Sequence, residues 1–135
     1  MDSISIHWEK TNYKSVKDYE DCFFYAFTRG KNILYVGKAD RMTVNREIKN
    51  HLRKFSTNGI SIWLGYIHYS TLERITAILI SDIESITICA NKPAYPIQHN
   101  RKYFYCRNNL KVVNHNLPLL KKTLVVKNNE LCTYP

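Results

Sequence analysis

The sequence predicts an α/β fold in which helices flank a small central β-sheet. Phe23–Phe27 and Ile33–Val36 are short aromatic and apolar runs separated by a loop that contains Gly30, which is the pattern of a β-hairpin. Apolar residues then recur at helical spacing from Val44 to Phe55, and an aromatic, β-branched stretch precedes a second helical pattern. The expected order is therefore hairpin, helix, strand, helix.

Each element has its own signal. The first helix is expected over about Thr43–Lys54, and the following strand over Ile60–Tyr69. Ser70-Thr71-Leu72-Glu73 has the form of a capping box, so the second helix should begin there and run to about Ala90. The flanking parts of the chain contribute further short strands, namely one with Ile4, Ile6 and Trp8 and two more at Tyr103–Cys106 and Leu124–Lys127.

Size and composition limit the class of protein. With 135 residues, 44% of them hydrophobic, the chain suits one domain over residues 1–135. The net charge of +9 favours a polyanionic partner, although a soluble domain can also carry such a charge simply to stay away from neutrality. No apolar run approaches the roughly 18 residues of a membrane span, and the four scattered cysteines lack metal-binding spacing. We therefore expect a cytoplasmic protein with reduced thiols and no membrane partner.

Two tyrosines, Tyr25 and Tyr35, stand ten residues apart on the two arms of the expected hairpin, and Tyr35 opens the sequence Tyr35-Val36-Gly37-Lys38. Paired tyrosines in a hairpin are also typical of ordinary cross-strand packing. A phenol has an ordinary pKa near 10, so it acts as a base at neutral pH only where cations favour the phenolate. Lys38 can supply part of that positive field.

Two later residues, His51 and Glu84, extend the pattern that begins with the hairpin tyrosines. His51 ends the basic first helix, and Glu84 lies on the second helix nine residues before Pro93. Together with the hairpin tyrosines, their order and spacing over about Cys22–Asn100 resemble the GIY-YIG nuclease family. The resemblance implies a single GIY-YIG-like nuclease domain with a core at about residues 22–105, preceded by an N-terminal strand and followed by a C-terminal extension.

The resemblance also implies an activity, namely a metal-dependent endonuclease that hydrolyses DNA phosphodiester bonds with one Mg²⁺ or Mn²⁺. Glu84 would be the metal ligand, since carboxylate oxygens suit hard cations. Glu73, on the same face of the expected helix, is a rival for that role.

The remaining catalytic roles fall on the hairpin and the first helix. Tyr25 or Tyr35 would act as the general base or orient the attacking water, with His51 in support. Lys38 and Arg46 would stabilise the phosphate.

Two positions depart from the family pattern. The arginine expected four residues before His51 is Glu47 here, and Arg46 comes one residue earlier, which is a rotation of about 100° around a helix. Arg41, in the preceding loop, is an alternative. The asparagine expected near the end of the motif is Pro96, which leaves its role to Asn91, His99 or Asn100.

DNA is the expected partner, RNA stays open, and the small size fits a homodimer or a separate targeting partner. The residues expected to bind nucleic acid are all basic, namely Lys38, Arg41, Lys49, Arg53, Arg101 and Lys102. The last two belong to a basic and aromatic segment, 99–105, which suits phosphate contacts with base stacking. The same segment is also typical of an edge strand guarded by charges.

Two other functions fit the composition. One is a non-catalytic nucleic-acid-binding module, whose binding would be metal-independent and sensitive to salt. The other is a protein–protein adaptor or inhibitor that acts through its basic face on an acidic partner.

Overall fold

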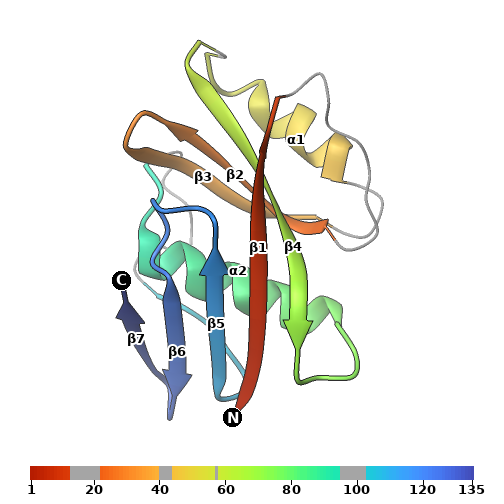
Figure 1. Ribbon diagram of the computed structural model, residues 1–135, viewed down its shortest axis with the longest axis vertical. Helices are drawn as coiled ribbons and strands as arrows, with labels where there is room; N and C mark the ends of the chain where they lie inside the picture. Colours follow the sequence, from red (N-terminus) through yellow and green to blue (C-terminus); the bar gives the residue numbers. More distant parts are fainter. Residues whose placement is uncertain (13–21, 40–43, 57, 95–102) are drawn as a thin grey trace.

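The expected hairpin, first helix and third strand are confirmed by a computed structural model, which describes residues 1–12, 22–39, 44–56, 58–94 and 103–135 (Figure 1). Strands β2 (Cys22–Arg29) and β3 (Asn32–Lys38) pair as the hairpin. Gly30 in its loop has a φ of 57°, a left-handed conformation that glycine adopts without steric cost. Helix α1 covers Val44–Leu52, and strand β4 covers Ile60–Ser70.

The sheet is much larger than the sequence suggested. It also contains β1 (Asp2–Thr11), β5 (Leu110–His115), β6 (Thr123–Lys127) and β7 (Glu130–Tyr134), and its strand order is β3-β2-β4-β1-β5-β6-β7. Strand β1 lies in the middle, antiparallel to β4 and parallel to β5. The two ends of the chain therefore build one half of the same sheet.

The expected α/β fold with a small central sheet flanked by helices is therefore wrong. The protein is mostly β, a curled mixed sheet that forms a half-barrel, with two helices in the described parts of the chain. The leading strand, expected to precede a core at about residues 22–105, is central in the sheet, and the expected strand at Tyr103–Cys106 is absent.

Strand β5 was not predicted from the sequence because a polar residue interrupts its pattern of alternating apolar residues. Leu110 and Val112 are buried, and so is Asn114 at the next inward position. The Asn114 amide is fully engaged there, since Trp8 Nε1 donates to its Oδ1 at 2.9 Å and its Nδ2 donates to the Lys121 carbonyl at 3.1 Å. A buried amide with both partners in place is compatible with a strand core.

The second helix, α2 (Ala77–Asn91), begins later than expected. Thr76 is its N-cap, and the Thr76 hydroxyl accepts from Leu79 N at 3.1 Å. The expected capping box is wrong because β4 continues to Ser70, whose hydroxyl accepts from Leu72 N at 2.9 Å and holds a turn instead. In the described ranges, neither helix has the length and apolarity needed to cross a membrane.

The two helices build two cores, with β2 between them. Helix α2 runs across the sheet behind β5, β1 and β4 in Figure 1, and its isoleucines pack with the inward residues of β1, β5 and β6. Helix α1 packs instead with Tyr25 and Phe27 of β2, whereas Phe24 and Ala26 face the α2 core. This alternation is the two-residue period of a strand. It turns Tyr25 toward α1.

Candidate active site

Four elements bring five of the predicted residues into one cluster, which we call the candidate site. These residues are Tyr25 on β2, Tyr35 and Lys38 on β3, His51 on α1 and Glu84 on α2. The Tyr25 and Tyr35 ring centroids are 5.9 Å apart, and His51 lies 4.9 Å from Tyr35 and 6.1 Å from Tyr25. The pairing of β2 with β3 and the packing of both helices on this hairpin produce the convergence.

Gly37 explains how the Tyr25 ring fits between the strands. Tyr25 pairs with Gly37 in the hairpin and is only 1% exposed. A Cβ on residue 37 would lie 2.4 Å from Tyr25 Cζ and 2.6 Å from its hydroxyl oxygen. Residue 37 must therefore lack a side chain so that the phenol can lie across it.

The two phenols differ in how readily each can lose its proton. Burial raises the pKa of both tyrosines, and the charges of Glu47 and Glu84 raise them further. A side-chain hydrogen bond joins the hydroxyls, and it raises the pKa of Tyr25 but lowers that of Tyr35. When Tyr35 ionises, the Tyr25 hydroxyl can therefore donate to its oxygen. Tyr35, half-buried rather than buried, is the better candidate to lose a proton.

His51 is set up to be neutral at neutral pH. Burial lowers the pKa of its imidazole, the Lys54 charge lowers it further, and Glu47 opposes both effects. The Nε2 atom lies 3.7 Å from Glu47 Oε2, and Lys54 Nζ lies 3.4 Å from Nδ1. The neutral imidazole therefore stacks on Tyr35 while its two nitrogens lie near Glu47 and Lys54.

Glu84 and Lys38 tie the end of β3 to α2. Burial raises the pKa of the Glu84 carboxyl, whereas the Lys38 charge and a hydrogen bond from the Lys38 backbone N–H lower it. The Lys38 ammonium donates to Ser81 Oγ at 2.6 Å, on the same face of α2 and three residues before Glu84. The site thus holds a half-buried carboxylate whose burial Lys38 offsets only in part.

The donor set fits a hard divalent cation held by one carboxylate. Glu84 supplies oxygen atoms, and an added positive charge would offset the effect of burial that raises its pKa. Among the described residues, no group of three or more His, Cys, Asp or Glu residues is arranged to hold a metal. A cation here would therefore depend on Glu84, water and substrate phosphate, a combination that Mg²⁺ commonly uses.

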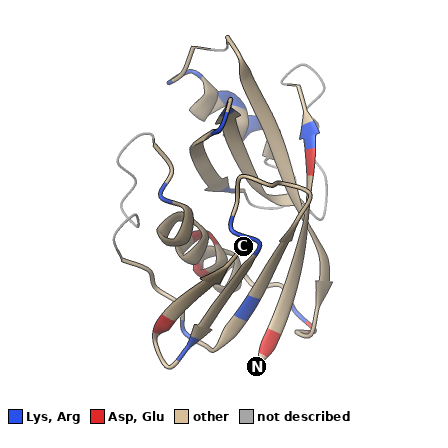
Figure 2. Cartoon of the chain, turned by 60° about the vertical axis from the view of Figure 1, so that its left-hand side comes forward, with Lys and Arg blue, Asp and Glu red and all other residues tan. Residues whose placement is uncertain are grey.

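Other predicted residues lie outside the cluster. Arg46 is exposed on α1, and Glu47 occupies the helix face that carries His51. Lys49 and Arg53 are exposed and make up the basic surface of α1, and Figure 2 marks the Lys and Arg positions of the chain in blue. Arg41, Arg101 and Lys102, together with Pro96, His99 and Asn100, lie outside the described residues.

Two alternatives from the sequence take other positions. Glu73 is exposed and precedes α2, so it no longer shares a helix face with Glu84. Asn91 donates to the Thr87 carbonyl at 2.9 Å and accepts from Lys121 N at 2.8 Å. Its amide therefore supports the connection between β5 and β6.

Sequence reasoning missed two residues of the site's surroundings. Glu47 stands where the motif resemblance predicts an arginine, and its charge raises the pKa of both tyrosines and of His51. Its four-residue spacing from His51 was the available signal. Ser81 anchors Lys38, and its three-residue spacing from Glu84 placed it on the relevant helix face.

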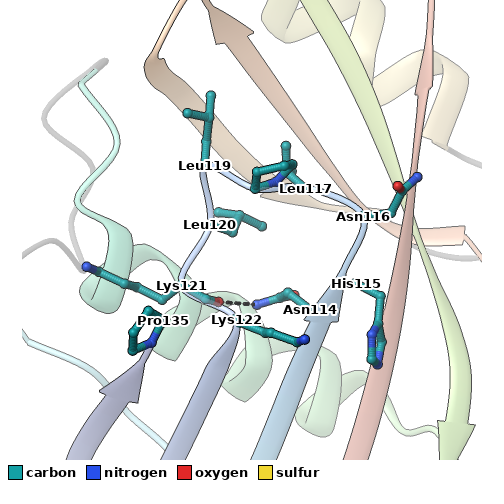
Figure 3. A pocket seen from close by; sticks show the side chains of 10 residues that line it. Asn114, His115, Asn116, Leu117, Leu119, Leu120, Lys121, Lys122 and Pro135 are labelled. Atoms are coloured by element: carbon teal, nitrogen blue, oxygen red, sulfur yellow. Dashed lines mark hydrogen bonds between the residues drawn. The ribbon is translucent and has the colours of Figure 1, made fainter.

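A cavity of about 400 Å³ lies elsewhere, at the connection between β5 and β6 (Figure 3). Its lining includes Asn114, His115, Lys121 and Lys122 but none of the cluster residues. Asn114 donates to the Lys121 carbonyl, the bond drawn in Figure 3, so this amide holds the loop. Among the described residues, none with a carboxylate side chain lines this cavity beside its basic residues.

No protein-family model, curated protein or solved structure matches this chain. The arguments for its function therefore come from the geometry of the candidate site and from the resemblance of its motifs.

Proposed function

We propose that this protein is a metal-dependent endonuclease that hydrolyses DNA phosphodiester bonds, with the candidate site as its active site. The observation that carries the proposal is the convergence of Tyr25, Tyr35, Lys38, His51 and Glu84 from four separate elements. These are the residues whose order resembles the GIY-YIG nuclease motifs. The resemblance concerns the motifs, since the half-barrel is a different overall architecture.

Tyr35 is the proposed general base, and Tyr25 positions it. The hydrogen bond with Tyr25 lowers the pKa of Tyr35, so the Tyr25 hydroxyl would stabilise negative charge on the Tyr35 oxygen. Burial works against ionisation of both phenols, which means that a phenolate needs added positive charge. Lys38 and the cation held by Glu84 would supply that charge, and His51, stacked on Tyr35, supports the base.

Lys38 and Glu84 support the phosphate side of the reaction. The Lys38 ammonium, oriented by Ser81, can stabilise negative charge on the phosphoryl oxygens. Glu84 would hold Mg²⁺ or Mn²⁺, which when bound neutralises developing charge and assists the leaving oxygen. By the motif resemblance, the products carry a 3′-hydroxyl and a 5′-phosphate.

The basic surface of α1 is the proposed contact for the DNA backbone. Lys49 and Arg53 are exposed there, next to His51, and the chain carries a net charge of +9. Such contacts fix the position of the duplex without reading its sequence. A cytoplasmic location belongs to the same proposal.

The test is nicking of supercoiled plasmid with Mg²⁺ or Mn²⁺, with EDTA as the metal-free control. Glu84→Gln should abolish nicking, whereas Glu73→Gln, at the exposed carboxylate outside the site, should retain it. Metal-independent DNA binding without nicking would refute the enzyme and support the non-catalytic binding module instead.

A further inference from the structure

Residues Tyr103–Arg107 alternate between the core and the solvent. Phe104 and Cys106 pack against the larger core, whereas Tyr103 and Tyr105 are 76% and 63% exposed. The segment forms no strand, but exposure alternates from one residue to the next along it. Tyr103, Tyr105 and Arg107 therefore face outward as a row, which we call the tyrosine strip.

Helix α2 holds the strip in place through two polar side chains. The Ser85 hydroxyl accepts from Tyr105 N at 2.7 Å. Asp82, only 4% exposed, accepts from Arg107 N at 3.1 Å and from the Arg107 guanidinium at 3.4 Å. The guanidinium carbon lies 5.0 Å from the centroid of the Tyr105 ring. A buried carboxylate thus orients a cation beside an exposed aromatic ring.

The strip lies alongside the candidate site on the same helix. Ser81, which accepts from the Lys38 ammonium, stands one turn before Ser85, which accepts from Tyr105 N. One turn of helix rises about 5.4 Å. A strand bound at Lys38 and Glu84 therefore has the tyrosine strip within reach of its adjacent nucleotides.

We propose that the tyrosine strip binds unpaired bases next to the scissile phosphate, so that the preferred substrate is DNA with a single-stranded segment beside the cut. Two exposed aromatic rings at alternate positions of one segment suit stacking of bases that have left the duplex. Paired bases inside a duplex present no free face to such a row. The oriented Arg107 adds positive charge, and the substrate class rests on the proposed nuclease function.

The test compares single-stranded and duplex binding in EDTA, where no cleavage occurs. Fluorescence anisotropy is measured with a labelled thymidine oligonucleotide of about 12 nucleotides, within the known range of single-strand site sizes, and with a duplex of equal length. In the Tyr103→Ala/Tyr105→Ala variant, single-strand affinity should fall about five-fold or more per tyrosine, the lower end of measured base stacking. Duplex affinity should change less than about two-fold, because the rows of phosphates still meet the basic surface.

Matched variants separate stacking from other roles. Tyr69→Ala/Tyr134→Ala removes two tyrosines that are 56% and 53% exposed on β4 and β7, and it should leave both affinities unchanged. Restoring the ring with phenylalanine at both strip positions should restore single-strand affinity. The inference is overturned if single-strand affinity survives the alanine variant, or if single-strand and duplex affinity fall by the same factor. Loss of nicking alone would refute the nuclease and leave the strip's binding result intact.

Discussion

A methyl group at position 37 is the sharpest perturbation of the candidate site. In Gly37→Ala, the new Cβ would lie 2.4 Å from Tyr25 Cζ, whereas carbon atoms pack at about 3.5–4.0 Å. The ring or the β3 backbone must therefore move by about 1 Å. The ring has little room, since Tyr25 is 1% exposed and its centroid lies 5.6 Å from that of Phe27.

The expected cost can be worked out from these contacts. Overpacking of this kind destabilises by about 1–3 kcal/mol, and replacing a strand glycine by alanine returns about 0.5–1 kcal/mol of backbone entropy. Gly37→Ala should therefore lower the free energy of unfolding by about 0–2.5 kcal/mol, the difference of those two effects. Urea denaturation of the purified protein measures it.

A double-mutant cycle identifies the cause. Tyr25→Leu removes the ring atoms that the new Cβ would meet. In that background Gly37→Ala should cost nothing or stabilise slightly, which gives a coupling energy of about 1–3 kcal/mol. An equal cost of Gly37→Ala in both backgrounds would refute the steric argument and, with it, the reason given for glycine in this motif.

Three further predictions follow from charge and burial. Glu84→Gln should raise the thermal midpoint of the metal-free protein at neutral pH, because burial raises the pKa of this carboxyl and penalises its charged form. The same substitution should remove any stabilisation of the protein by Mn²⁺. A lower midpoint in the variant would contradict the first point. The folded state lowers the pKa of His51, so the unfolded chain binds its proton more readily, and this contribution to stability should be lost as pH falls below about 6.5. Urea midpoints between pH 5 and 8 should show a weaker pH dependence in His51→Gln, and identical profiles would exclude this role. Finally, Lys49→Ala/Arg53→Ala should reduce the slope of log affinity for duplex DNA against log salt by up to about 2, roughly 0.9 for each lost phosphate contact; an unchanged slope would remove the basic surface of α1 from the interface.

Local patterns predicted the elements that position the site. The aromatic runs around Gly30 indicated the hairpin, and the helical spacing from Val44 indicated α1. Each of these signals comes from residues that are close together in the sequence. The sheet as a whole depends on distant pairs such as Asp2 with Leu110, which no local pattern reveals. The central position of β1 and the pairing of β5 to β7 could therefore not be predicted from the sequence.

The candidate site, too, could be predicted from the sequence only in part. Spacing along the chain singled out Tyr25, Tyr35, His51 and Glu84, and the structure brings their elements together. Which phenol donates to the other depends on depth of burial and on the neighbouring carboxylates, which follow from tertiary packing. The role of Glu47 beside His51 likewise becomes visible only when α1 lies against the hairpin.

The most direct test of the account is the rate of plasmid nicking by Tyr35→Phe under single-turnover conditions. This change removes one oxygen atom and keeps the ring that packs against Tyr25, Phe27 and His51. If Tyr35 is the general base, the rate should fall by at least about 100-fold while the thermal midpoint stays near that of the wild type. Tyr69→Phe, at an exposed tyrosine on β4, should nick at the wild-type rate. Full activity in Tyr35→Phe would contradict the account and reduce the tyrosine pair to packing in the core.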